Sequence, residues 1–140
     1  MTRPLSIRFD QRLLERLRRR AAIQDSTPSG LAQRLVDEGL RAQEHPGVVF
    51  RDGPSGRRAA LVAGPDVWEV VAAIRAVGSA DEDEAVALAA ADLSLPAAWV
   101  RLALDYYGEF PDEVDSQIAD NETAAIAAHA AFQARQRLFA

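Results

Sequence analysis

The first 44 residues carry one strand pattern and two short helical patterns, and this combination limits the folds that the chain can adopt. In residues 5–9 (LSIRF) apolar and polar side chains alternate, which is the two-residue period of a strand with one buried face. Apolar residues at helical spacing then predict a first helix over residues 11–24 and a second over residues 28–43. One strand and two short helices cannot bury a core alone, and a lone strand leaves both of its edges unpaired. The sequence therefore predicts a homodimer, in which two strands pair as an antiparallel ribbon above four helices.

Capping residues predict where these helices begin. Asp10 stands immediately before the first helix, where its carboxylate can accept a hydrogen bond from an unpaired backbone N–H. The polar stretch 25–29 (DSTPS) ends that helix and starts the next one. Within this stretch Thr27 is expected to be the N-cap. Pro28 suits the first turn of a helix, because the N–H that it lacks would have no partner there.

The ordered pattern over residues 4–40, PLSIRFDQRLLERLRRRAAIQDSTPSGLAQRLVDEGL, resembles the ribbon-helix-helix family of bacterial repressors and antitoxins. The features that carry the resemblance are an alternating strand, a capped helix, a polar turn with Ser and Thr, and a second apolar helix. The resemblance implies an intertwined dimer whose two-stranded ribbon enters the major groove of DNA.

The same resemblance implies which side chains read DNA. Ser6 and Arg8 are expected to contact bases from the outward face of the ribbon, since arginine can donate two hydrogen bonds to guanine and serine can serve several bases. Pro4 takes the third outward position, where the family usually has a polar residue, so we expect it to make at most a van der Waals contact. Arg3 is expected to reach a phosphate. The alternative is an exposed strand face that binds nothing.

The start of the second helix is a further expected DNA contact. Unpaired backbone N–H groups and the helix dipole favour an anion there, so Thr27 and Ser29 are expected to lie against the DNA backbone. Plain helix capping is the alternative, and the two roles are compatible. The basic run 16–20 (RLRRR) covers successive helical positions, which cannot all face one way, so most of its arginines are expected to be solvated.

Charge is distributed unevenly along the chain. Residues 1–44 hold nine arginines and six acidic residues, a net charge of +3, whereas residues 45–140 hold seven arginines and fifteen acidic residues, a net charge of −8. A basic first domain suits contact with phosphate. An acidic second domain would repel the DNA backbone and would instead suit a basic partner.

A second domain is expected over residues 45–140. The apolar runs 48–50 and 59–62 flank a turn sequence and predict a β-hairpin. Helices are expected to follow it: one from Asp66 to Gly78, one capped by Ser79, one after the turn at residues 93–96, and a last one after Pro111. The predicted fold class is thus mainly α: a ribbon-helix-helix domain over residues 1–44, then a hairpin, a three-helix unit like a helix-turn-helix, and a C-terminal helix.

The second half also carries a resemblance. The blocks HPGVVFRDGPSGRRAALVAGPDVWEVV (45–71) and ALDYYGEFPDEVDSQIADN (103–121) resemble the antitoxin-associated domain of unknown function four-three-three. That domain is similar to a compact three-helix unit preceded by a hairpin, and it often stands beside genes for toxins that resemble PIN-type ribonucleases. The two resemblances together imply an antitoxin that represses its own operon as a dimer and neutralises a PIN-like ribonuclease. A cytoplasmic location is expected, because the N-terminal residues lack the apolar core of a signal peptide.

The surface that binds such a toxin is expected in the acidic second domain or on the final helix. Apolar and aromatic side chains would lie in a groove of the partner. The residues expected to do so are Tyr106, Tyr107, Ile118, Ile126 and Phe132.

Other functions remain open at this point. The chain could be a stand-alone ribbon-helix-helix regulator whose second domain binds a ligand or adds oligomer contacts, or an interaction protein that never touches DNA.

An enzyme is not expected, because no catalytic constellation is present, and no cofactor or metal is expected either. The chain has no cysteine, its histidines His45 and His129 show no evident chemistry, and the acidic pairs 81/84 and 112/115 fit helix first turns. The absence of an apolar segment of about 20 residues excludes a membrane span from the expectation.

Overall fold

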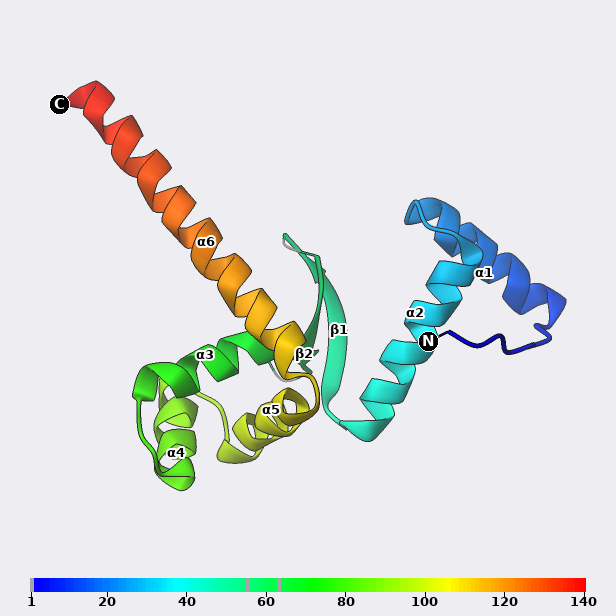
Figure 1. The fold of residues 1–140 in the computed structure, drawn as a ribbon, viewed down its shortest axis with the longest axis horizontal. Helices are drawn as coiled ribbons and strands as arrows, with labels where there is room; N and C mark the ends of the chain where they lie inside the picture. Colours follow the sequence, from blue (N-terminus) through cyan, green and yellow to red (C-terminus); the bar gives the residue numbers. More distant parts are fainter. Residues whose placement is uncertain (1, 55, 63) are drawn as a thin grey trace. The chain divides into compact units, whose positions relative to one another are not determined.

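The computed structural model describes residues 2–54, 56–62 and 64–140, and within these ranges the chain is mainly helical with one small antiparallel sheet (Figure 1). This confirms the expected fold class at that level. The residue contacts divide the chain into two compact units, one that ends at Arg41 and one that runs from Ala42 to Ala140, so the division falls three residues before the boundary expected after residue 44. In chain order the elements are α1 (Gln11–Ile23), α2 (Pro28–Glu44), β1 (Val48–Gly53), β2 (Gly56–Leu61), α3 (Val67–Val77), α4 (Glu82–Leu93), α5 (Ala97–Glu109), α6 (Pro111–Gln136) and the short 3-10 helix η1 (Arg137–Phe139).

The first unit is a pair of helices with the predicted caps. The carboxylate of Asp10 accepts a hydrogen bond from the backbone N–H of Arg12 at 2.9 Å, and α1 begins at the next residue after Asp10. The turn between the helices is made by Asp25, whose backbone is left-handed with φ 52°. Ala21 of α1 and Leu31 of α2 are the apolar residues that are buried in this unit. One alanine and one leucine are a minimal core for a unit of about 40 residues, which is consistent with the expectation that the unit cannot bury a core alone.

The second unit is built on the hairpin and four helices. Strands β1 and β2 pair in antiparallel register from Val48 opposite Leu61 to Gly53 opposite Gly56, which confirms the predicted hairpin. Gly47 precedes the hairpin with φ 101°, and a Cβ there would come within 3.0 Å of side-chain atoms of Leu102 and Trp99, so only glycine fits. The core contains apolar side chains from every element of the unit except η1, and its largest fully buried members are Tyr106, Leu61, Val67, Val70, Val86, Val100 and Val114.

The helix ends of the second unit follow the predicted boundaries with one exception. Gly78 ends α3 in a left-handed conformation with φ 70°, as expected for a C-cap glycine. The expectation that Ser79 caps α4 is wrong. Asp81 is the N-cap, and its carboxylate accepts a hydrogen bond from the backbone N–H of Glu84 at 2.9 Å. Ser79 lies two residues earlier, where its hydroxyl bonds to Asp81 N and to the Glu84 side chain instead.

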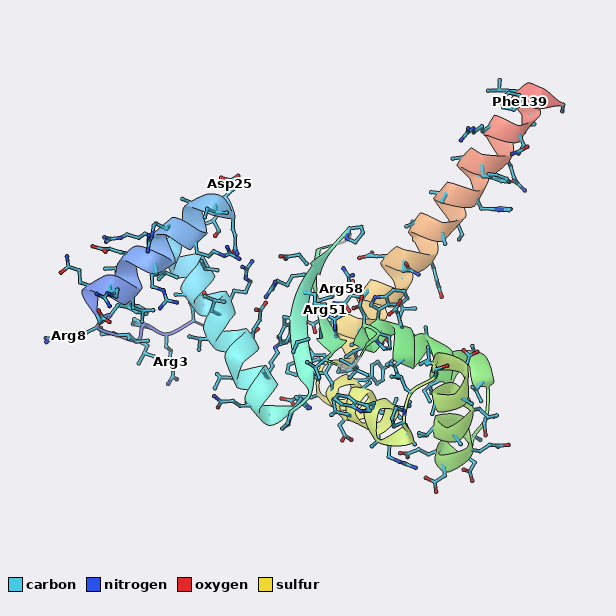
Figure 2. All side chains as sticks on the ribbon, turned by 180° about the vertical axis from the view of Figure 1, so that it is seen from behind. Arg3, Arg8, Asp25, Arg51, Arg58 and Phe139 are labelled. Carbon is cyan, nitrogen blue, oxygen red and sulfur yellow. The ribbon has the colours of Figure 1, made fainter. Side chains whose placement is uncertain are left out.

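Helix α6 is packed only along its beginning. Val114 and Ile118 are buried in the core of the second unit, whereas every residue over 119–140 is exposed. Figure 1 shows this part of α6 extending away from the other helices of its unit. The exposed half of α6 is alanine-rich and is followed by η1, whose last residue, Phe139, Figure 2 labels at the far end.

Among the described residues no single helix is both long and apolar enough to cross a bilayer. Helices α4 and α5 meet a length and composition test only when taken together, and they are bent by 113° at the break between them.

Candidate nucleic-acid and partner-binding surfaces

The residues expected to read DNA lie together in the segment before α1. Arg3, Pro4, Ser6 and Arg8 are all exposed, and Figure 2 shows Arg3 and Arg8 on this segment. In the single chain residues 2–10 belong to no helix and no strand. A strand requires a hydrogen-bonded neighbour, and the predicted neighbour belongs to a second copy. The ribbon therefore stays a prediction about the dimer.

The side chains that alternate with these residues along the segment are apolar, and they are also exposed. Leu5 is 81% exposed, Ile7 57% and Phe9 39%. Together with Leu14, Leu17 and Val36 of the two helices, these side chains line an open groove in the first unit, which we call the apolar groove. Large apolar side chains seldom gather on a surface that stays in water. The groove is thus the part of the first unit that most needs a partner.

At the start of α2 the two expected contact residues, Thr27 and Ser29, differ in their hydrogen bonding. Thr27 Oγ1 accepts a hydrogen bond from the backbone N–H of Gly30 at 3.0 Å, which confirms Thr27 as the cap. Pro28 has no N–H, and the N–H of Leu31 bonds to the Thr27 carbonyl at 2.9 Å. Among the described residues the backbone N–H and hydroxyl of Ser29 have no partner. Ser29 is therefore the better placed of the two residues for an anion.

The basic run on α1 is solvated, as expected. All four of its arginines are exposed. Three of them, Arg16, Arg19 and Arg20, share one side of the helix with the exposed Ile23 and Leu13. This side holds positive charge and apolar area together.

Two of the expected partner-binding residues are placed by the structure inside the core, which corrects the expectation for them. Tyr106 is fully buried, and its hydroxyl donates a hydrogen bond to the Glu113 carboxylate at 2.7 Å. Ile118 is 7% exposed. Their side chains pack the second unit and are not available to a partner. By contrast Ile126 and Phe132 are exposed on α6, at 72% and 57%.

Tyr107, the remaining expected contact, belongs to a polar network that joins three helices. Its hydroxyl lies 3.1 Å from Asp115 of α6 and accepts a hydrogen bond from Arg75 of α3 at 3.0 Å. Arg75 also forms an ion pair with Asp115. The hydrogen bond from Arg75 holds the pKa of Asp115 below its ordinary value, and the same bond raises the pKa of Arg75. The network explains Asp115 without a bound cation.

The acidic cluster at the start of α4 also has a structural explanation. Asp81 caps the helix, and the acids that follow occupy its first turn, where the helix dipole favours negative charge. Arg101 of α5 bonds to Asp83 at 2.7 Å and lies 3.7 Å from Glu82. This cluster is consistent with the helix-capping interpretation.

The sequence interpretation missed one contact in the second unit. His45, which had shown no evident chemistry, places its Nε2 atom 2.6 Å from Oε2 of Glu109, and the adjacent Glu44 completes the cluster. His45 and Glu109 are separated by 64 residues, so no local spacing signals the contact. The sequence also gives no indication that His45 contacts the rings of Tyr106 and Phe110.

Comparison with known proteins adds no relative to these observations. No family model, no curated protein and no solved structure matches the chain. The function must therefore be argued from the surfaces themselves.

Proposed function

We propose that this chain is a homodimeric DNA-binding regulator of the ribbon-helix-helix class that acts as an antitoxin. The observation that carries the proposal is the apolar groove of the first unit. Three side chains at alternate positions, Leu5, Ile7 and Phe9, are exposed beside the apolar faces of α1 and α2. A second copy that pairs its own residues 5–9 with this segment would cover them and would supply the missing strand neighbour.

The energetic gain from such pairing is substantial. Full burial of a leucine, isoleucine or phenylalanine side chain contributes about 1.5–3 kcal/mol each. Each chain offers three of these side chains on the segment, besides Leu35, Val36 and Leu40 on α2, which are also exposed. The two buried apolar residues inside the first unit contribute far less. Folding of this unit would therefore be coupled to dimerisation.

The side chains between the apolar ones suit DNA. Because successive residues of a strand point to opposite faces, Ser6 and Arg8 would face outward once residues 5, 7 and 9 are covered. Ser29 adds an unpaired N–H and a hydroxyl at the start of α2, and Arg3 adds a charge. The net charge of +3 over residues 1–44 would favour approach to phosphate.

The antitoxin role rests on the second unit. Residues 45–140 carry a net charge of −8, which would attract a protein with a basic, RNA-binding surface, as a ribonuclease has. The exposed half of α6 presents Ile126 and Phe132 without burying either. A helix that lies in a groove of its partner is a common recognition mode. We place the toxin contact on this half of α6, at Ile126 and Phe132, which lie beyond the blocks that carry the resemblance.

DNA binding is tested by fluorescence anisotropy on DNA from upstream of the gene, at two salt concentrations. The Ser6→Ala/Arg8→Ala variant should lose specific binding and keep weak, salt-sensitive binding. Arg101→Ala, which removes an exposed arginine from the second unit, is the matched control and should bind as the unaltered protein does. Equal binding by the double variant and the control would overturn the proposal that the ribbon reads DNA.

Toxin binding is tested by co-purification with the product of the adjacent short reading frame. Ile126→Ser/Phe132→Ser should lose the complex, whereas Leu88→Ser, an exposed apolar residue on α4, should keep it. Equal binding of the product to both variants would mean that its contact lies outside Ile126 and Phe132. A product that does not bind the unaltered protein would favour a stand-alone regulator.

A further inference from the structure

A histidine and two glutamates converge in the second unit at residues where helices end. Glu44 is the last residue of α2, His45 follows it, and Glu109 is the last residue of α5. The Nε2 atom of His45 lies 2.6 Å from Oε2 of Glu109, and one ligand atom from each of the three residues lies within 4.8 Å of the other two. All three residues follow Ala42 and so belong to one compact unit.

The two carboxylates stand at helix C-terminal ends, where a cation is favoured. The C-terminal end of a helix carries partial negative charge from carbonyl groups without partners, which favours a cation and disfavours a carboxylate. Glu44 and Glu109 each stand at such an end. The ends of α2 and α5 and the two carboxylates thus bring negative potential to one place, and the start of α6 at Pro111 offsets part of it beside Glu109.

Several other carboxylates of the second unit pair with an arginine. Among the described residues, neither Glu44 nor Glu109 has an arginine within ion-pair distance, and the polar partner of the Glu109 carboxylate is the imidazole of His45. The two glutamates therefore have no arginine to balance their charge among the described residues. Arginine pairs in the same unit include Asp52 with Arg57, Asp66 with Arg58, Asp115 with Arg75, and both Asp83 and Glu82 with Arg101.

The imidazole is held in a fixed orientation towards the two carboxylates. The His45 ring meets the rings of Tyr106 and Phe110 edge-on, with centroids 5.3 Å and 6.1 Å away, and its side chain is only 11% exposed. A ligand that is already ordered loses little rotamer entropy on binding a metal. Imidazole nitrogen is the commonest side-chain metal ligand, and zinc combines it readily with carboxylate oxygen.

We propose that Glu44, His45 and Glu109 form a binding site for a divalent transition-metal cation of the zinc type. The three side chains supply one nitrogen and two oxygen donors, and water would complete the coordination. The two carboxylates balance the charge of the cation. Nε2 must be free of a proton to bind, so any proton that it shares with Glu109 is released to solvent when the metal enters. Magnesium, which prefers a shell of oxygen ligands alone, is disfavoured by the imidazole.

A protonated His45 is the competing source of positive charge. That explanation requires His45 and Glu109 but gives Glu44 no part, and it requires no metal. The two explanations therefore differ in the effect of Glu44 and in the response to zinc.

The experiment is isothermal titration calorimetry of the full chain with zinc chloride, and with magnesium chloride as the comparison. We expect one zinc ion per chain and no magnesium uptake. His45→Gln, Glu44→Gln and Glu109→Gln should each weaken zinc binding by about tenfold or more. His129→Gln, which alters the exposed histidine of α6, is the matched control and should bind zinc as before.

Three results would overturn the proposal: no zinc binding by the unaltered chain, full retention in Glu44→Gln, or equal loss in the His129→Gln control. Circular dichroism reports whether each variant keeps its helices. If His45→Gln loses them, the two glutamate variants decide, because exposed Glu44 and half-exposed Glu109 tolerate an amide of the same size. The outcome does not depend on whether the chain binds DNA or a toxin.

Discussion

Arg58 in β2 forms an ion pair with Asp66, the residue that precedes α3, and so ties the hairpin to the start of that helix. Asp66 is buried and also accepts a hydrogen bond from the indole of Trp68 at 3.2 Å. Opposite Arg58 on β1, Arg51 donates to the carbonyl oxygens of Leu61 at 2.7 Å and Gly64 at 3.1 Å, and Figure 2 shows the two arginines next to each other. Both arginines therefore hold the loop that connects the hairpin to α3.

Asp66→Asn should destabilise the second unit by about 2–3 kcal/mol, because it leaves a largely buried guanidinium without its counter-charge. We discount the full penalty of a buried pair since the side chain of Arg58 is 20% exposed. Urea unfolding followed by tryptophan fluorescence measures the change, since both tryptophans lie in this unit. Asp92→Asn, at an exposed position of α4, is the control and should change stability by less than about 0.5 kcal/mol. Equal effects of the two variants would contradict this account of the pair.

Gly53→Ala should destabilise the hairpin by about 1–2 kcal/mol. A Cβ at Gly53 would overlap the guanidinium of Arg58, and the pair with Asp66 restrains that group from moving aside. The penalty should therefore vanish in an Arg58→Ala background, which a double-mutant cycle measures. Gly108→Ala is the control, because nothing lies within 4 Å of its added Cβ in α5, and it should stabilise by about 0.5–1 kcal/mol. A penalty that persists without Arg58 would mean that the backbone at Gly53 is the cause.

Local patterns predicted most of the fold because they depend on neighbouring residues. Asp10, Thr27 and Gly78 are caps whose chemistry is complete within one helical turn, and the structure confirms all three. Ser79 and Asp81 are both good caps two residues apart, so propensity could not choose between them. In the structure Asp81 is the cap, and Ser79 bonds to the backbone and side chains around it.

The surfaces were harder to predict because they depend on contacts between distant segments. Tyr106 was expected at an interface, since aromatic residues favour both interfaces and cores, and only tertiary packing shows that it is buried. The contact of His45 with Glu109 has no local pattern at all. The helical period of the sequence also gives no indication that α6 is packed up to Ile118 and exposed from residue 119 onwards.

The ion pair of Arg75 with Asp115 predicts a pH dependence of stability. The pKa of Asp115 is lowered in the folded chain by the hydrogen bond from Arg75. A lowered pKa means that the pair stabilises the fold at neutral pH, and that this contribution is lost as pH falls through the pKa of the folded state. The stability difference between the unaltered chain and Asp115→Asn should thus be constant above about pH 5 and shrink below it. Asp120→Asn, at an exposed position of the same helix, should show no such trend when both are measured by urea unfolding.

The two faces of residues 5–9 give the sharpest test of the proposed dimer. Ile7→Asp would place a charge among the apolar side chains that a second copy covers, at a cost of about 3 kcal/mol or more per buried charge. The dimer dissociation constant should rise by about 100-fold or more, since each 1.4 kcal/mol is about tenfold. Ser6→Asp adds the same charge one residue away, on the opposite face of a strand, and should leave the dimer intact while abolishing DNA binding. Sedimentation equilibrium distinguishes the two variants. Monomers in both, or dimers in both, would mean that residues 5–9 do not pair as a strand, because only a two-residue period makes adjacent positions behave differently.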